Sequence, residues 1–145
     1  MQDHDRITAK IDAFYEAISG PPGYEHDWHL LATLFVSGAS ILSHRREGSQ
    51  GALSVSAYVN RLASSLVDRD FYERGFDYRI EIQGDIAQVR GRYEASSQPE
   101  FLEILKSGTN LIHFAREKGG WKIAGMVYQD DRLRSSSDGL GDAKC

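Results

Sequence analysis

Two histidines are the first candidates for chemistry in this sequence, because imidazole titrates close to physiological pH. His44 and His113 fall in stretches with the alternation of β-strands, and they can form a polar pair. His44 shares a strand face with Leu42 and also fits a solvated residue at a loop edge. His113 shares a face with Leu111 and Ala115, where a cavity role and a hydrogen-bonded core role are both open.

A second group of candidates occupies residues 25–29, Glu-His-Asp-Trp-His. His26 and His29 lie three positions apart, so at a helix start they would offer two neighbouring metal ligands. Asp27 fits the N-cap of that helix, and the sequence places no third histidine beside the pair. We therefore expect no metal site and no cofactor.

Aromatic side chains form the third group, and they suit a hydrophobic cavity. The candidates for lining it are Tyr15, Trp28, Tyr58 and Tyr93, whereas Trp121 fits a core position. The hydroxyls of Tyr15 and Tyr58 need hydrogen-bond partners when buried, and a cavity supplies them. Aromatic stripes on helices and strands also fill ordinary cores, so both interpretations stay open.

The composition of the 145-residue chain restricts its partners. With 17 basic and 21 acidic residues the net charge is −4, which offers no electrostatic footprint for nucleic acid or an anionic membrane. The first residues lack the basic start and apolar run of a signal peptide, and no window approaches the roughly 20 apolar residues of a membrane span. We expect a cytoplasmic protein that binds neither nucleic acid nor membrane. Cys145, the single cysteine, leaves no internal disulfide.

An antiparallel sheet over residues 75–129 must position these side chains. Residues 76–83 alternate apolar and polar without a break, as a strand with one buried face does. Gly84-Asp85 then predicts a hairpin turn. Two later stretches, residues 111–115 and 123–128, are apolar at odd and even positions alike, so both of their faces should be buried.

Helices should cover one face of that sheet. We predict them over about residues 4–19, 27–37 and 54–68, with a strand over residues 39–44 between the last two. Asp27 should cap the second helix, and Ser54 or Ser56 the third. The first helix has an apolar stripe at helical spacing, formed by Ile7, Ile11, Phe14 and Ile18.

This order of elements indicates one α+β domain over residues 1–131, with three N-terminal helices gathered on one face of a curved sheet. Residues 132–145 are rich in Ser, Gly and Asp and predict a flexible polar tail. A strongly bent sheet over helices leaves a hollow at its wide end, and binding cavities form in such places.

The sequence resembles the nuclear transport factor 2-like superfamily, in particular its small SnoaL-like and ketosteroid isomerase-like bacterial members. Residues 11–18, 28–41, 84–89 and 120–123, together with Tyr128, carry the resemblance, which extends over roughly residues 5–131 in element order. It implies a cone-shaped antiparallel sheet wrapped on the helices, a cavity between sheet and helices, and frequent dimerisation. It implies no single function, because enzymes and non-catalytic binding proteins share the fold.

The resemblance also implies site residues by position. The helix-1 tyrosine of ketosteroid isomerases, an oxyanion hydrogen-bond donor, falls on Tyr15. Their catalytic aspartate falls on or beside Ser43, whose hydroxyl is no base near neutral pH without an activating neighbour. Their protonated oxyanion-site aspartate falls near Asn110, whose amide can donate without a raised pKa. The resemblance therefore does not extend to the isomerase mechanism.

Two hypotheses about function follow from these residues. The first is a protein that binds a small hydrophobic molecule without turnover, which the missing carboxylate base favours. The alternative is a cofactor-free isomerase, dehydratase or polyketide-cyclase-like enzyme. In that enzyme Tyr15 and Asn110 would polarise a carbonyl, and His113 or His44 would transfer a proton.

We also expect a homodimer formed by the outer face of the sheet. If Trp121, Ile123 and Val127 face the helices, Met126 and Tyr128 face away, and helices on one side leave them uncovered. Large exposed apolar patches are unusual on soluble monomers, so a second copy should bury this one.

Overall fold

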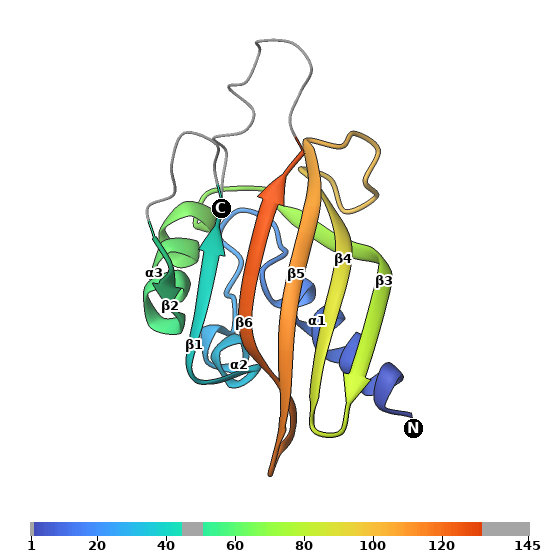
Figure 1. Ribbon diagram of the computed structural model, residues 1–145. Helices are drawn as coiled ribbons and strands as arrows, with labels where there is room; N and C mark the ends of the chain where they lie inside the picture. The colour runs from blue at the N-terminus through green and yellow to red at the C-terminus, as the bar shows by residue number, and fades with distance from the viewer. Residues whose placement is uncertain (1, 45–50, 132–145) are drawn as a thin grey trace.

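The computed structural model describes residues 2–44 and 51–131, which form an α+β fold with helices on one face of a curved sheet (Figure 1). The predicted tail over residues 132–145 lies outside the described residues. The helices are α1 (Asp3–Ala17), α2 (Trp28–Thr33) and α3 (Val55–Leu66). The strands are β1 (Phe35–Ser43), β2 (Leu53–Ser54), β3 (Tyr72–Gln83), β4 (Ile86–Ser96), β5 (Lys106–Glu117) and β6 (Gly120–Asp130).

The predicted caps begin two of the helices. The Asp27 carboxylate accepts a hydrogen bond from the Leu30 backbone N–H at 2.9 Å, and the Ser54 hydroxyl accepts one from the Ala57 N–H at 3.1 Å. The second helix is shorter than predicted and ends at Thr33, because the Leu34 carbonyl accepts from the Ile123 N–H of β6 at 2.8 Å. Strand β1 therefore starts before the predicted residue 39.

The strands follow the order β2-β1-β6-β5-β4-β3 in one six-stranded sheet. The hairpins β3–β4, β4–β5 and β5–β6 are antiparallel, as their alternation and turns predict. Strand β1 differs, because it runs parallel to β6. The sheet is thus mostly, not wholly, antiparallel, and the chain between β1 and β6 contains all the other strands.

A bulge in β6 overturns the predicted assignment of its faces. His113 of β5 pairs with Gly125, and Phe114 pairs with Ile123, so Ala124 is an extra residue without a partner. The extra residue reverses the alternation. Met126 is consequently buried at 3% exposure, whereas Val127, predicted to face the helices, is 42% exposed on the outer face.

The core lies between α1 and the inner face of the sheet. The predicted stripe of α1 is buried throughout, with Ile7, Ile11, Phe14 and Ile18 each at most 3% exposed. Leu62 and Leu66 bring α3 into the same core, together with Ile112 and Phe114 of β5. In the described part of the chain, no helix is long and apolar enough to cross a membrane.

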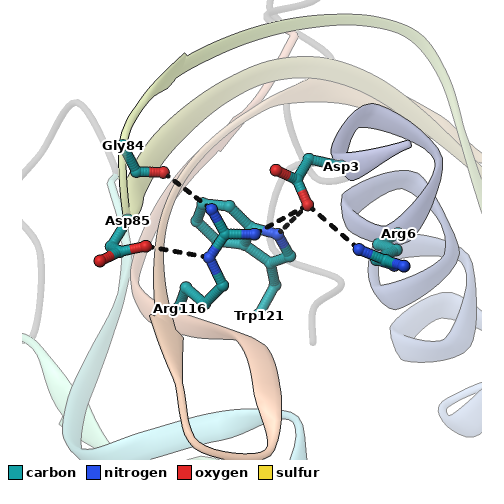
Figure 2. A network of polar contacts seen from close by, with 6 residues as sticks. All are labelled: Asp3, Arg6, Gly84, Asp85, Arg116 and Trp121. Carbon is teal, nitrogen blue, oxygen red and sulfur yellow. Dashed lines mark hydrogen bonds and ion pairs between the residues drawn. The ribbon is translucent and has the colours of Figure 1, made fainter. Parts of the chain in front are cut away.

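A polar network fixes the N-terminal end of α1 to the sheet (Figure 2). One oxygen of Asp3 accepts from the Trp121 indole N–H at 3.2 Å, from Arg116 at 2.9 Å and from Arg6 at 3.5 Å. Arg116 lies over the Trp121 ring, 4.6 Å from its centroid, and donates to Asp85 at 3.0 Å. The network joins α1, the β3–β4 turn and the β5–β6 hairpin, and so sets where α1 lies on the sheet.

Candidate functional site

A narrow cavity, here called the inner cavity, lies between α1, α3 and the inner face of the sheet. It encloses about 290 Å³ between side chains, counting its mouth, and its interior has room for roughly one water molecule. Its aromatic lining consists of Phe14, Tyr15, Tyr58, Tyr93 and Tyr128. The other lining residues are Glu73, Lys106, Asn110 and Met126. The cavity is therefore aromatic with a few polar groups, as small-molecule sites commonly are.

The inner cavity contains a buried pair of polar side chains. Tyr15 of α1 is 4% exposed and Asn110 of β5 is 3% exposed. The Asn110 amide nitrogen donates to the Tyr15 hydroxyl at 3.2 Å. The amide oxygen has no hydrogen-bond partner among the described residues. If the amide were turned over, its nitrogen would take the unpaired position instead, so one polar atom of Asn110 lacks a partner in either orientation.

The Tyr15 hydroxyl remains protonated in this environment. Burial raises the pKa of Tyr15 above its ordinary value, and the charge of the nearby Glu73 carboxylate raises it further. The hydrogen bond from Asn110 acts in the opposite direction but is the smaller effect. Tyr15 is thus a neutral phenol that can both donate and accept.

Glycines on the inner face make room for the tyrosines. A Cβ at Gly75 of β3 would lie 2.6 Å from a ring carbon of Tyr15 and would also overlap Tyr78. A Cβ at Gly108 of β5 would overlap the Tyr93 hydroxyl. Each glycine allows a ring to lie directly against the sheet, which a larger residue would prevent.

A second polar group includes Tyr93 and Lys106, two of the residues that line the inner cavity. The Tyr93 hydroxyl donates to Asp130 at 2.7 Å, and the other oxygen of Asp130 lies 3.6 Å from the Lys106 ammonium. Burial raises the pKa of Tyr93, and the charges of Asp130 and Glu73 raise it further. Tyr93 is therefore a second neutral phenol, but its hydroxyl hydrogen is already engaged in the hydrogen bond to Asp130.

An adjoining space, here called the outer cavity, shares two walls with the inner one. Tyr58 and Tyr128 line both, and the outer cavity encloses about 460 Å³ including open solvent. It is also lined by Ile41, Ser43, Gly51, Leu53 and Arg61. Two tyrosine side chains are thus common to the lining of the two spaces.

We compared the sequence and the fold with those of known proteins. No protein-family model and no curated protein matches the sequence. Solved structures do match. A protein of unknown function from Mycobacterium tuberculosis aligns at a TM-score of 0.72 and 19% identity, over 92% of this chain and 79% of that one. An NTF2-like protein with a cystatin-like fold from Novosphingobium aromaticivorans aligns at a TM-score of 0.71 and 13% identity, over 94% of this chain and 86% of that one.

A third structure, an NTF2-like protein of unknown function from Silicibacter pomeroyi, aligns at a TM-score of 0.64 and 19% identity. The alignment covers 90% of this chain and 100% of that one. The chain has the NTF2-like, cystatin-like fold. At these identities the likeness concerns the fold and carries no activity with it.

Within this NTF2-like fold the predicted site residues separate into three groups. Tyr15, Asn110, Tyr58 and Tyr93 line the inner cavity together. Ser43 lines the outer cavity and not the inner one. The remaining three predicted residues, His113, His44 and Trp28, line neither cavity.

The two strand histidines do not reach Tyr15. His113 is exposed on the outer face of the sheet with Leu111, because its neighbours Ile112 and Phe114 point inward. The prediction that His113 shares the cavity is therefore wrong. His44 is exposed just beyond the end of β1, where its backbone N–H donates to the Tyr128 carbonyl at 2.9 Å.

The segment at residues 25–29 has a packing role. The His26 ring stacks on Trp28 with 4.6 Å between centroids, and its Nδ1 lies 2.9 Å from the Ala17 carbonyl. This arrangement holds Trp28 at the end of α1, away from the cavity. Over residues 2–44 and 51–131, no group of three or more His, Cys, Asp or Glu side chains is placed to hold a metal ion.

Sequence reasoning missed the two charged residues of the inner cavity, Glu73 and Lys106. A bulge in β3 explains Glu73. The register shifts between Phe76 and Arg79, and Asp77 adopts a positive φ of 58°. After the bulge, the even-numbered residues of β3 face the helices. If the same alternation held before the bulge, the odd-numbered Glu73 would lie on the outer face. Its pairing with buried Ala95 instead puts it on the inner face.

Proposed function

We propose that this protein binds a small, largely apolar molecule in the inner cavity and hydrogen-bonds one oxygen of that molecule to Tyr15 and Asn110. The observation that carries this proposal is the unpaired amide atom of Asn110, at 3% exposure. Such an atom costs about 1–3 kcal/mol when left without a partner. A ligand hydroxyl that donates to this amide oxygen and accepts from the Tyr15 hydroxyl recovers this free energy.

Binding requires the narrow space to open. The side chains of Tyr58 and Tyr128 border both cavities, so rearrangement of these two rings is the step that would enlarge the inner cavity toward the outer one. The enlarged space suits a ligand with its oxygen at Asn110 and its apolar part among the rings. Side-chain rearrangement of this kind is common on binding.

A cofactor-free isomerase, dehydratase or polyketide-cyclase-like enzyme is the second candidate. A proton carrier for such a reaction must lie beside the bound ligand, which excludes the exposed His113 and His44 in this arrangement. The observation that favours an enzyme is the Glu73 carboxylate, which lines the same cavity as Tyr15 and Asn110. Turnover of a carbonyl probe that stops in a Glu73→Ala variant would favour the enzyme over the binding protein.

The binding proposal is tested with cyclohexanol, a small apolar alcohol whose hydroxyl can donate to the Asn110 amide oxygen and accept from Tyr15. It is titrated into the labelled protein, and binding is followed by backbone amide NMR. We expect shifts of Asn110 and its neighbours, and about two- to tenfold weaker binding to a Tyr15→Phe variant, since one hydrogen bond is lost. Tyr24→Phe is the matched control, because Tyr24 is 54% exposed and outside the cavity. Equal affinities of all three proteins, or no binding to any, would reject the proposal.

A further inference from the structure

The ring of Tyr78, on strand β3, fills a gap in the inner face of the sheet next to Tyr15. Two glycines leave this gap, because a Cβ at Gly75 would overlap the Tyr78 hydroxyl and a Cβ at Gly91 would lie 2.9 Å from a carbon of its ring. The same Cβ at Gly75 would lie 2.6 Å from a carbon of the Tyr15 ring. The space over Gly75 and Gly91 that the Tyr78 ring fills is here called the glycine slot.

The glycine slot borders the residue of the inner cavity that has an unpaired polar atom. Gly91 of β4 pairs directly with Asn110 of β5. The Cβ positions of such partners lie about 4.5–5.5 Å apart on one face of a sheet. Asn110 is 3% exposed, and its amide oxygen has no hydrogen-bond partner among the described residues. A ring in the glycine slot therefore lies beside Asn110 and Tyr15, to which we assign the ligand's oxygen.

The bulge in β3 directs Tyr78 over the two glycines. The register against β4 shifts between Phe76 and Arg79, and Asp77 adopts a φ of 58°, in the left-handed region. The even-numbered Tyr78 consequently packs on the inner face, as does the odd-numbered Gly75 before the bulge. Bulges that aim one side chain in this way are frequent next to functional sites.

A hydrogen bond to helix α1 holds Tyr78 in the glycine slot. The Tyr78 hydroxyl donates to the Asp12 carboxylate at 3.0 Å. Burial raises the pKa of Tyr78, and the charge of Asp12 and this hydrogen bond raise it further, so the hydroxyl stays protonated. Asp12 is exposed, so water can replace it as a partner when the ring moves. Outward rotation of Tyr78 thus costs this bond and the burial of one ring, which a ligand's ring would restore.

We propose that the glycine slot is the subsite for the ring of the ligand, which enters between α1 and β3 as Tyr78 rotates outward. The ligand is a small, flat phenol, whose ring replaces that of Tyr78 and whose hydroxyl reaches Tyr15 and Asn110. This inference rests on the proposed function and adds the ligand's chemical class and its route. The slot enlarges the inner cavity on the side of β3, whereas the outer cavity lies toward β1, near the other end of the sheet.

Tyr78→Phe tests this subsite through the sign of its effect. The variant lacks a hydrogen bond that the ligand must break, so we expect phenol to bind it about two- to tenfold more tightly than the unmodified protein. Enlargement toward the outer cavity leaves that bond intact and predicts equal affinities. Backbone amide NMR of the labelled full chain gives the affinities, and the amides of Gly75 and Gly91 should shift on titration.

Tyr72→Phe is the matched control on the same strand. The Tyr72 hydroxyl also donates to a carboxylate, that of Asp70, at 3.0 Å, and Tyr72 lines neither cavity. Its affinity for phenol should equal that of the unmodified protein. Asp12→Ala removes the same hydrogen bond of Tyr78 from the other side and should also tighten binding, which is sufficient if Tyr78→Phe fails to fold.

A comparison of two alcohols tests the class of ligand. Phenol should bind about two- to tenfold more tightly than cyclohexanol, because a flat ring fits the place of the Tyr78 ring and adds aromatic contacts. Cyclohexanol binding as tightly as phenol would overturn the assignment of a flat ring.

The remaining outcomes distinguish the glycine slot from the proposed function. Phenol binding that is unchanged or weaker in both Tyr78→Phe and Asp12→Ala would overturn the slot and retain the oxygen site. Equally tighter binding to Tyr72→Phe would overturn the slot as well, since that residue lies outside it. Failure of both phenol and cyclohexanol to bind would overturn the proposed function itself.

Discussion

A buried tyrosine and asparagine face each other in the inner cavity, and their energetics are unusual for a core. Asn110 donates to Tyr15 at 3.2 Å, yet its other polar atom is unpaired among the described residues. Proteins normally satisfy almost all buried polar atoms, since each unpaired one costs free energy of folding. A residue retained at such a cost is typical of a binding site, where stability is given up for function.

Substitutions of this pair should be non-additive in stability. Tyr15→Phe alone removes the partner of the Asn110 amide, and we expect a loss of about 1–3 kcal/mol in the free energy of unfolding. Adding Asn110→Leu removes the unpaired group as well, so the double variant should be at least as stable as Tyr15→Phe. Urea unfolding measures both values. A double variant less stable than Tyr15→Phe would contradict the idea that Asn110 carries a folding cost.

At the scale of elements, the first residue of α1 has a large share in positioning the site. Asp3 receives hydrogen bonds from Trp121 and Arg116, which belong to the β5–β6 hairpin (Figure 2). As an acidic residue in the first turn, it also interacts favourably with the helix dipole. Tyr15 lies at the other end of the same helix, so a displaced α1 would move its hydroxyl away from Asn110.

The Asp3 contacts predict a pH-dependent contribution to stability. The Trp121 hydrogen bond, followed by Arg116, lowers the pKa of Asp3 below its ordinary value. A lowered folded-state pKa means that the contribution is present above about pH 4, the ordinary aspartate value, and is lost as the pH falls through the folded-state pKa. Asp3→Asn should therefore lower the thermal midpoint at pH 7, and the difference should shrink at pH 3.

Asp5→Asn provides the control for that measurement, because Asp5 is exposed in the same turn of α1. Its thermal midpoint should follow that of the unmodified protein at both pH values. A difference between Asp3→Asn and the unmodified protein that is equally large at pH 7 and pH 3 would show that charge is not the cause.

At the scale of the whole molecule, the outer face of the sheet is the surface without a cover from the helices (Figure 1). Leu42, Val127 and Leu111 pair across β1, β6 and β5 and form one continuous row. Val127 is 42% exposed and Leu111 is 48% exposed. This row, not Met126 and Tyr128, is the apolar surface that a second copy would bury.

We propose that two copies associate through this row, burying upwards of about 1,200 Å² in total. Light scattering at micromolar concentration should give about twice the chain mass of 16.2 kDa. Leu111→Lys should reduce it toward a single chain, because a charge would enter an apolar interface. Leu102→Lys is the control, since Leu102 is 75% exposed in the loop before β5. A mass near 16.2 kDa for the unmodified protein would reject the dimer.

The sequence by itself determined the elements and most of the core. Alternation over residues 76–83, the turn at Gly84-Asp85, the caps and the apolar stripe of α1 are local features, so local patterns report them. Positional resemblance to a known fold also brought Tyr15 and Asn110 together as a pair. The local features depend on neighbours in the chain, which the sequence displays directly, whereas the Tyr15–Asn110 pair came from the resemblance alone.

Only the tertiary structure decided which faces of β3 and β6 line the site. The bulges at Asp77 and Ala124 each add one residue against the partner strand, so the alternation of faces before each bulge is opposite to that after it. That is why Glu73 and Met126 enter the inner cavity and why Val127 is outside. A bulge is defined by its pairing with another strand, and that pairing is not visible in either segment alone.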